Sequence, residues 1–230
     1  MSDRRAVAAE LAAAGYESGP GAAVLATARA STRIGAATVV LLVEGISDQA
    51  AVEAAALGRG RDLRAERVVV VPVGGAHAAG RFLRAVGPLD PGTLVLGLCD
   101  APEADVFRRG LDGARTGAPA HGTPAPGTSS EGPVDALFVC TPDLEGELIR
   151  ALGPALVEAC LAEQGDLAAF RSLQGQPAWR DRPVDAQLRR FLGSGARRKT
   201  RYARVLVAAA TRDARLPAPL DRILDAARPA

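Results

Sequence analysis

The chain has 230 residues, of which 48% are hydrophobic and 3% aromatic, and its formal net charge is +2 at pH 7. This size and composition suit one large domain or a core domain with an appendage, and the scarcity of aromatic residues disfavours recognition of single-stranded nucleic acid by stacking of its bases. No apolar run approaches the roughly 18 residues of a membrane span, and the three cysteines form no CxxC pair, so we expect a reduced, cytoplasmic protein without membrane contact.

The first elements expected along the chain are two short helices, after which strands and helices alternate. An Ala-rich helix is expected at 3–14, a Gly/Pro turn at 19–21, and a second helix that reaches the first strand at 38. Strands are expected at 38–43, 67–73, 93–99 and 134–140, followed by helices at 47–57, 76–86, 103–112 and 143–151. This alternation predicts an α/β fold in which a four-stranded parallel sheet lies between helices.

The remaining segments carry no strand pattern. Residues 113–133 are rich in Gly, Pro, Ser and Thr, which predicts a mobile surface loop with His121 exposed on it. Beyond Pro154, helical patterns are seen at 154–170, 185–192, 197–213 and 217–228. We therefore predict an N-terminal helical extension (1–35), an α/β core (36–153) and a C-terminal all-α region (154–230).

Acidic residues follow three of the four predicted strands. Glu44 follows the run VVLLV, Asp100 follows LVLGLC, and Asp143 and Glu145 come shortly after ALFVC. Ligands of parallel sheets bind beyond the carboxyl ends of the strands, so we expect these acids to converge there. Because Mg²⁺ prefers oxygen ligands, the pattern predicts a divalent-metal site, although each acid alone could simply be stabilised at the start of a helix. Asp48 is expected in the first turn of the next helix, close enough to share a cation with Glu44.

Four segments together resemble a Toprim domain: VVLLVEGISDQAAVEAAA, VVVVPVGGAHAAGRFLRAVG, LVLGLCDAPEADVFRRGL and TPDLEGELIRALG. The pattern is most similar to the Toprim nuclease domain of the overcoming-lysogenization-defect (OLD) family, over roughly residues 36–215. The resemblance implies a Toprim-like Rossmannoid fold and a Mg²⁺- or Mn²⁺-dependent nuclease with one or two ions, a DNA endonuclease or nickase. It also implies metal-binding roles for Glu44, Asp48, Asp100, Asp143 and Glu145, with Glu44 catalytic as well.

One position departs from the family pattern. Toprim domains typically carry Asp-x-Asp after the third strand, whereas Pro102 stands where the second aspartate belongs. Glu103 or Asp105 could reach the same ion, and we favour Glu103. If neither does, the second metal is lost. The alternative function is therefore a catalytically degenerate module that binds metal, nucleotide or a partner protein in a defence or regulatory complex.

Lys199 is the only lysine in a chain with 27 arginines, which suggests a task for a compact ammonium group. Its surroundings, RRKTRYA, are similar to the lysine-plus-helix segment of the OLD family, which implies that Lys199 stabilises charge on the scissile phosphate. The neighbouring Arg197, Arg198 and Arg201 are expected to bind nucleic-acid phosphates, or else to form a solvated helix face. The turn Gly74-Gly75 could bring amides to a phosphate, or could be needed only for a sharp turn.

Three other functions fit the sequence less well than a nuclease does. The segment GSGARRKT comes near a P-loop, but Arg198 replaces the last glycine and no strand precedes it, so we reject that interpretation. No tyrosine lies near the acids, which disfavours a topoisomerase-like covalent step, and primase-like nucleotidyl transfer is a lesser alternative. OLD nucleases carry an ATPase domain ahead of the Toprim domain, and only 37 or so residues stand there in this sequence. The resemblance therefore implies that any control by ATP comes from a separate ATPase partner.

Overall fold

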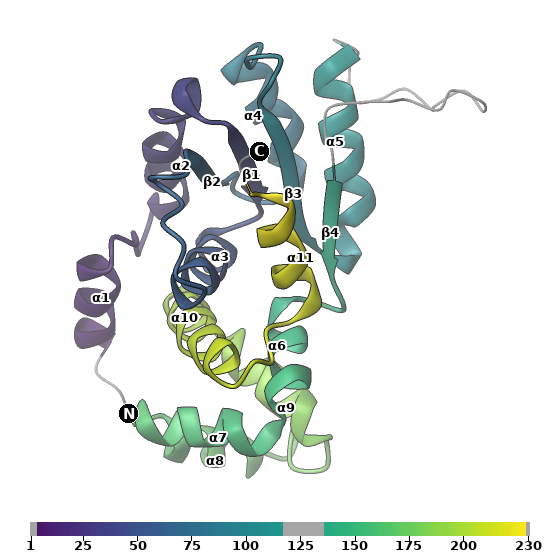
Figure 1. Cartoon of the computed structure of the whole chain (residues 1–230). Helices are drawn as coiled ribbons and strands as arrows, with labels where there is room; N and C mark the ends of the chain where they lie inside the picture. Colours follow the sequence, from purple (N-terminus) through teal and green to yellow (C-terminus); the bar gives the residue numbers. More distant parts are fainter. Residues whose placement is uncertain (1–3, 117–135, 229–230) are drawn as a thin grey trace.

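The computed structural model describes residues 4–116 and 136–228, and its centre is a four-stranded parallel sheet. The strands, in the spatial order β2-β1-β3-β4, are β1 (Val39–Val43), β2 (Val68–Pro72), β3 (Leu94–Asp100) and β4 (Ala136–Cys140). The α/β fold with a parallel sheet is confirmed, and Figure 1 shows the strands running between helices. The pairing aligns Val43 with Leu98, so the ends of β1 and β3 lie side by side in the middle of the sheet.

Helices cover both faces of the sheet. Those before and between the strands are α1 (Arg4–Ala13), α2 (Ala22–Ser31), α3 (Ile46–Gly58), α4 (Ala79–Val86) and α5 (Ala104–Thr116), with short 3₁₀ turns at Ile34–Ala36, Ala76–Ala78 and Ala101–Glu103. Residues 113–116, which we expected to begin a loop, instead extend α5. The rest of that predicted loop, from 117 on and including His121, lies outside the described residues.

Strand β1 is buried on both faces because its apolar residues alternate between two cores. Leu41 belongs to the core that contains residues of α3, α10 and α11, whereas Leu42 belongs to the core that contains Phe107 of α5 and Ala79 of α4. Every residue of β1 and β2 is buried. The continuous valine and leucine runs in the sequence therefore reflect a central sheet with no exposed face.

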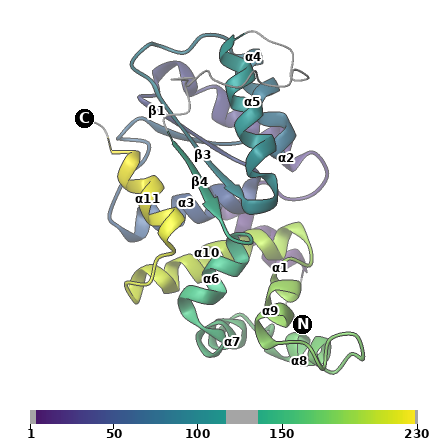
Figure 2. The ribbon, with the colours of Figure 1, turned by 90° about the vertical axis from the view of Figure 1, so that its right-hand side faces the viewer.

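The C-terminal region is entirely helical in the described residues. Its helices are α6 (Leu144–Leu152), α7 (Pro154–Glu163), α8 (Leu167–Gln174), α9 (Val184–Leu192), α10 (Ala196–Arg212) and α11 (Ala218–Ala226). The single helix expected at 154–170 is two helices, since Gly165 adopts a positive φ of 73° between them. Figure 2 shows α6 to α10 gathered beneath the lower end of the sheet, where β4 leads into α6. None of the described helices is long and apolar enough to cross a membrane.

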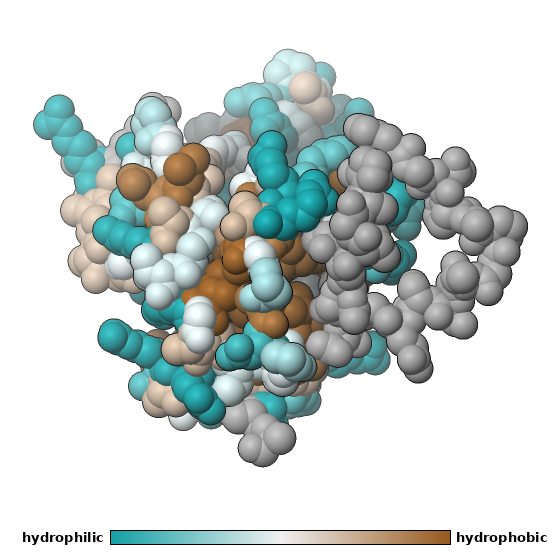
Figure 3. All heavy atoms as spheres, turned by 90° about the horizontal axis from the view of Figure 1, so that it is seen from above, coloured by the Kyte–Doolittle hydropathy of each residue, from teal (hydrophilic) through white to brown (hydrophobic). Residues whose placement is uncertain are grey.

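The two ends of the sheet differ in surface character. Figure 3 views the molecule from above, onto the edge opposite the carboxyl ends of the strands, and apolar side chains gather in the middle of that face with hydrophilic ones around them. The acidic residues at the carboxyl ends of β1, β3 and β4 lie at the other end, where Asp100 accepts from the start of α6 and Glu145 pairs with Lys199 of α10. The fold therefore places the candidate site between the sheet and the C-terminal helices.

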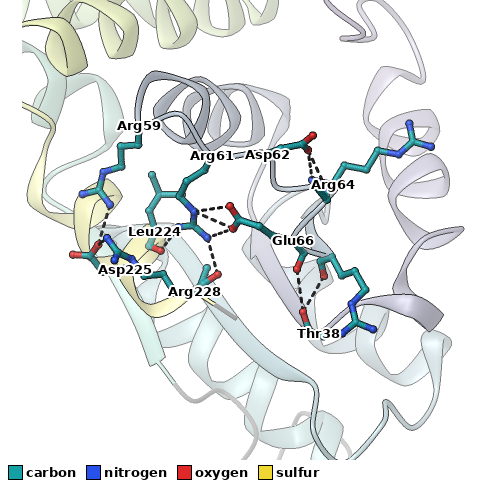
Figure 4. A network of polar contacts seen from close by, with 12 residues as sticks. Thr38, Arg59, Arg61, Asp62, Arg64, Glu66, Leu224, Asp225 and Arg228 are labelled. Carbon is teal, nitrogen blue, oxygen red and sulfur yellow. Dashed lines mark hydrogen bonds and ion pairs between the residues drawn. The ribbon is translucent and has the colours of Figure 1, made fainter. Parts of the chain in front are cut away.

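A largely buried arginine joins the last helix to the connection between α3 and β2 (Figure 4). Arg61, whose side chain is 12% exposed, pairs with Glu66 at 2.5 Å and donates to the main-chain carbonyls of Leu224 and Ala227. Arg59 adds an ion pair with Asp225 of α11 at 3.0 Å. The end of α11 exposes carbonyls that lack partners within the helix, and the guanidinium of Arg61 satisfies two of them.

Substitution of this arginine tests how strongly α11 is held. We expect Arg61→Ala to lower the free energy of unfolding by about 2 kcal/mol, because it removes charge-assisted hydrogen bonds from a largely buried site. Urea unfolding followed by circular dichroism measures the change. Arg64→Ala is the matched control, since Arg64 is exposed and nearby, and its substitution should cost less than about 0.5 kcal/mol. Equal losses in both variants would contradict the assigned role.

Candidate metal and phosphate site

The acids at the ends of β1 and β3 are in direct contact. Glu44, which follows β1, accepts a hydrogen bond through Oε1 from the backbone N–H of Asp100 at 2.8 Å. Asp100 in turn accepts through Oδ1 from the N–H of Leu144 at the start of α6, at 3.1 Å. Two carboxylates thus connect β1, β3 and the helix that follows β4. The convergence arises because parallel pairing aligns the strand ends, as the sequence pattern predicts.

Asp48 lies in the first turn of α3, immediately after the tight connection from β1. Its Oδ2 accepts a hydrogen bond from the N–H of Gly45 at 2.9 Å, which fixes the carboxylate at the start of the helix. The charge of this carboxylate also raises the pKa of Asp100, so the two acids interact electrostatically. Asp48 therefore belongs to the same cluster as the strand-end acids.

The two acids after β4 are both held by basic side chains. Asp143 caps α6 through a 2.8 Å hydrogen bond from Gly146 N–H to Oδ1, and its Oδ2 lies 2.6 Å from Nε of Arg189 on α9. Glu145 is 7% exposed, and its Oε1 lies 3.3 Å from Nζ of Lys199 on α10. Helices of the C-terminal region thus supply the positive charges of this site.

Burial and mutual repulsion raise the pKa values of these acids and so disfavour their ionised forms. Burial raises the pKa of Asp48 to about 7, opposed by the charge of Lys199 and assisted by that of Glu145. Burial and the charge of Asp48 likewise raise the pKa of Asp100 to about 7. The pKa values of Glu44 and Glu145 are also raised, chiefly by burial. Several carboxyl groups therefore share a small volume in which their negative charges are incompletely balanced.

The same surroundings favour the charged form of Lys199, whereas they disfavour the charged form of the acids. Burial by itself lowers the pKa of this amine, but the charges of Glu145, Asp48 and Asp100 outweigh that effect, and the pKa is raised. The side chain is 34% exposed. Lys199 is therefore a fully charged ammonium group at neutral pH, next to the acids and accessible to solvent.

Glu103 and Asp105, the two candidates to replace the aspartate that is missing at position 102, lie in different surroundings. Glu103 is half-buried, and its charge raises the pKa of Glu44. The side chain of Asp105 is 80% exposed and pairs with Arg108 at 3.4 Å. Glu103 thus lies nearer to the acid cluster electrostatically, and its role as a replacement ligand stays a prediction.

Two predicted phosphate contacts have other partners in the structure. The N–H groups of Gly74 and Gly75 both donate to the main-chain carbonyl of Glu44, at 3.0 and 2.8 Å, and both glycines have positive φ. Both N–H groups thus already have an acceptor, and the need for a sharp turn accounts for the two glycines without a bound phosphate. Arg201 is 11% exposed and lies 3.2 Å from Glu10 and 3.7 Å from Asp166. Its partners make it a packing residue between α1, α10 and the start of α8.

The other two arginines of the predicted phosphate set lie at the start of α10. Arg197 is exposed, whereas the guanidinium of Arg198 lies 4.2 Å from the ring centroid of Phe191 and bonds to Ser194. Arg197 is thus open to solvent, and Arg198 is partly engaged in packing. Their binding to phosphate stays a prediction.

Comparison with known proteins agrees with this geometry. The family described as overcoming lysogenization defect protein-like, TOPRIM domain, matches residues 37–97. The C-terminal region of the Xanthomonas campestris pv. campestris OLD protein has a similar structure, with a TM-score of 0.55 and 22% identity over 84% of this chain and 95% of that chain. Residues 37–97 thus match the OLD-like Toprim family, and the chain has the fold of OLD C-terminal regions.

A second solved structure supports the same fold. The C-terminal region of the Burkholderia pseudomallei OLD protein matches with a TM-score of 0.52 and 22% identity over 83% of this chain and 98% of that chain. The comparison with curated proteins gave no match. The likeness of fold therefore extends well beyond residues 37–97.

Toprim domains generally bind a divalent metal ion, and the residues here can be tested against that property. The donor atoms suit a divalent cation, because hard carboxylate oxygens are offered by Glu44, Asp48, Asp100 and Glu145, and a cation would relieve their mutual repulsion. The side chains are not yet placed to bind one, since among residues 4–116 and 136–228 no three acidic, histidine or cysteine side chains are grouped as a metal site. These oxygens thus suit Mg²⁺ or Mn²⁺, while Lys199 pairs with Glu145 and Arg189 pairs with the neighbouring Asp143.

A cleft of about 650 Å³ opens next to the Toprim acids. Asp143, Glu145 and Lys199 line one part of it, and Trp179 lines another. The remaining charged residues of its wall are arginines from α9 and the preceding segment, namely Arg182, Arg189 and Arg190. Trp179 and Arg182 were not among the predicted site residues, because nothing in their local sequence connects them with acids some 35 to 40 positions earlier.

The raised pKa of Asp48 predicts how stability depends on pH. Its pKa is higher in the folded protein, about 7, than the 3.8 of a free carboxyl, so the stabilisation associated with its protonation is complete below about pH 4 and lost as pH rises through 7. We expect Asp48→Asn, in chelator, to stabilise the protein at about pH 8 by at least about 1 kcal/mol, or roughly 2–4 °C in melting temperature. The gain should nearly vanish at about pH 4, and an equal shift at both pH values would contradict it.

Proposed function

We propose that this protein is a metal-dependent nuclease that hydrolyses phosphodiester bonds of nucleic acid, with DNA as its substrate. The observation that carries the proposal is the contact between Glu44 and Asp100 at adjacent strand ends, surrounded by Asp48, Glu145 and Lys199. The OLD-like Toprim domain supports a nucleic-acid-related function on independent grounds. A cluster with surplus negative charge and one accessible ammonium group is suited to holding a cation and a phosphate together.

The chain's own residues would have separate tasks in this reaction. Bound Mg²⁺ or Mn²⁺ would supply Lewis-acid chemistry, held by oxygens of Glu44, Asp48, Asp100 and Glu145, with Glu103 and Asp143 as further candidates. Lys199 would approach the scissile phosphate and stabilise the negative charge that develops on its oxygens. The arginines of the cleft wall would hold neighbouring phosphates and so orient the strand.

Glu44→Gln tests the acid at the centre of the site. Glutamine keeps an oxygen that can accept from Asp100 N–H but removes the negative charge, so the fold should persist while metal-dependent cleavage falls by at least about 100-fold. Plasmid nicking with Mn²⁺ measures the activity, and circular dichroism checks the fold. Arg64→Ala is the matched control and should nick as fast as the wild type. Wild-type protein that leaves plasmid intact at high concentration would overturn the nuclease proposal.

Lys199 is tested by Lys199→Met, which keeps the apolar stem and removes the charge. We expect cleavage to fall by about 100-fold while Mn²⁺ binding, measured by isothermal titration calorimetry, is retained or strengthened, because the positive competitor beside Glu145 is gone. Loss of metal binding in this variant would instead show that Lys199 serves to position the acids. Unchanged cleavage would remove it from the catalytic set.

Two observations favour a second function. Both oxygens of Asp143 already have partners, and Pro102 stands in the usual position of a Toprim aspartate, which together suggest a catalytically degenerate module. Such a module would bind metal, nucleotide or a partner such as a separate ATPase in a defence or regulatory complex. Retained Mn²⁺ binding without any plasmid cleavage is the result that would select this alternative.

A further inference from the structure

The cleft beside the acids combines features of a nucleotide-binding site. Its volume of about 650 Å³ lies in the range of ordinary ligand pockets, and its wall carries the only tryptophan of the chain. Trp179 is partly exposed. An accessible indole in a cleft is a surface on which a flat base can stack.

The segment that carries Trp179 is held in place by a buried amide. Gln187 of α9, which is 4% exposed, donates through Nε2 to the main-chain carbonyls of Trp179 and Arg182, at 2.8 and 2.9 Å. Its Oε1 accepts from Gln174 of α8 at 2.6 Å. One side chain thereby fixes the connection between α8 and α9. A platform ordered before binding loses less entropy when a ligand arrives.

Positive charge surrounds the indole. The guanidinium of Arg190 lies 6.0 Å from the ring centroid of Trp179, and Arg182 and Arg189 are exposed on the same wall. Lys199, next to Glu145, lines the same cleft. One cleft thus combines an aromatic ring with four cationic side chains, and this combination suits consecutive phosphates of one strand.

We infer that this cleft binds an unpaired nucleotide, with its base stacked on Trp179 and its flanking phosphates held by Arg182 and Arg190. The inference rests on the proposed nuclease function and names its substrate class: nucleic acid that is single-stranded, or unpaired next to the cleaved bond. In an intact duplex the faces of each base are covered by its neighbours, so a paired base cannot stack on the indole. The strand would run from Trp179 toward Lys199 and the acids.

The fluorescence of Trp179 gives a direct test, because no other tryptophan contributes. The full chain is titrated in chelator, so that cleavage cannot occur, with a short oligothymidylate and with a DNA duplex of equal length. We expect quenching by the oligothymidylate and not by the duplex. With fluorescently labelled oligothymidylate and anisotropy detection, Trp179→Ala should weaken binding about tenfold and Trp179→Phe by less than about threefold.

Matched variants separate stacking from general charge attraction. Arg190→Ala should weaken binding of the oligothymidylate and make its dependence on salt concentration shallower, whereas Arg64→Ala should bind like the wild type. The inference is overturned if the oligothymidylate does not quench the indole or if Trp179→Ala binds it as tightly as the wild type does. It is also overturned if Trp179→Ala weakens the binding of single-stranded and duplex DNA by the same factor. Quenching that depends on Trp179 together with absent cleavage in Mn²⁺ would uphold the cleft and refute the nuclease function.

Discussion

The parallel pairing of β1 with β3 is the constraint on which the rest of the site depends. It aligns Val43 with Leu98, so the carboxylate of Glu44, one residue after Val43, meets the backbone N–H of Asp100, two residues after Leu98. Each residue of β1 is buried, so a one-residue shift in register would move every side chain of the strand from the core in which it packs to the opposite one. The free energy of core packing therefore also fixes the position of the acids, and the site gains a precision that loops alone would not provide.

The fold and the acid cluster could largely be predicted from the sequence, because both follow from local patterns. Continuous valine and leucine runs ending in Glu44 and Asp100 indicate buried parallel strands with acids at one edge, and the structure has them there. Helix boundaries were less accurate, since Gly165 breaks a pattern that reads as continuous. Periodicity reports which face is apolar, but it does not report where the backbone turns.

The contacts made by the C-terminal helices could not be predicted in the same way. Arg201 and Arg197 stand four residues apart on one helix, yet one is largely buried between Glu10 and Asp166 and the other is exposed. Which of them meets solvent depends on where α1 and the start of α8 pack. Likewise, composition correctly indicates few aromatic residues, but only packing brings Trp179 beside the acids.

Charge balance connects the acid cluster with the cleft. Arg189 occupies Asp143 and Lys199 occupies Glu145, so two cationic side chains hold carboxylates that are candidate metal ligands. A divalent cation and these side chains compete for the same oxygens. Under the proposed function, Arg189 and Lys199 would leave these carboxylates when a cation is held there, and would then be available to phosphate oxygens in the cleft they line. By linkage, phosphate that draws these side chains away from the acids must raise the affinity for the cation by the same factor.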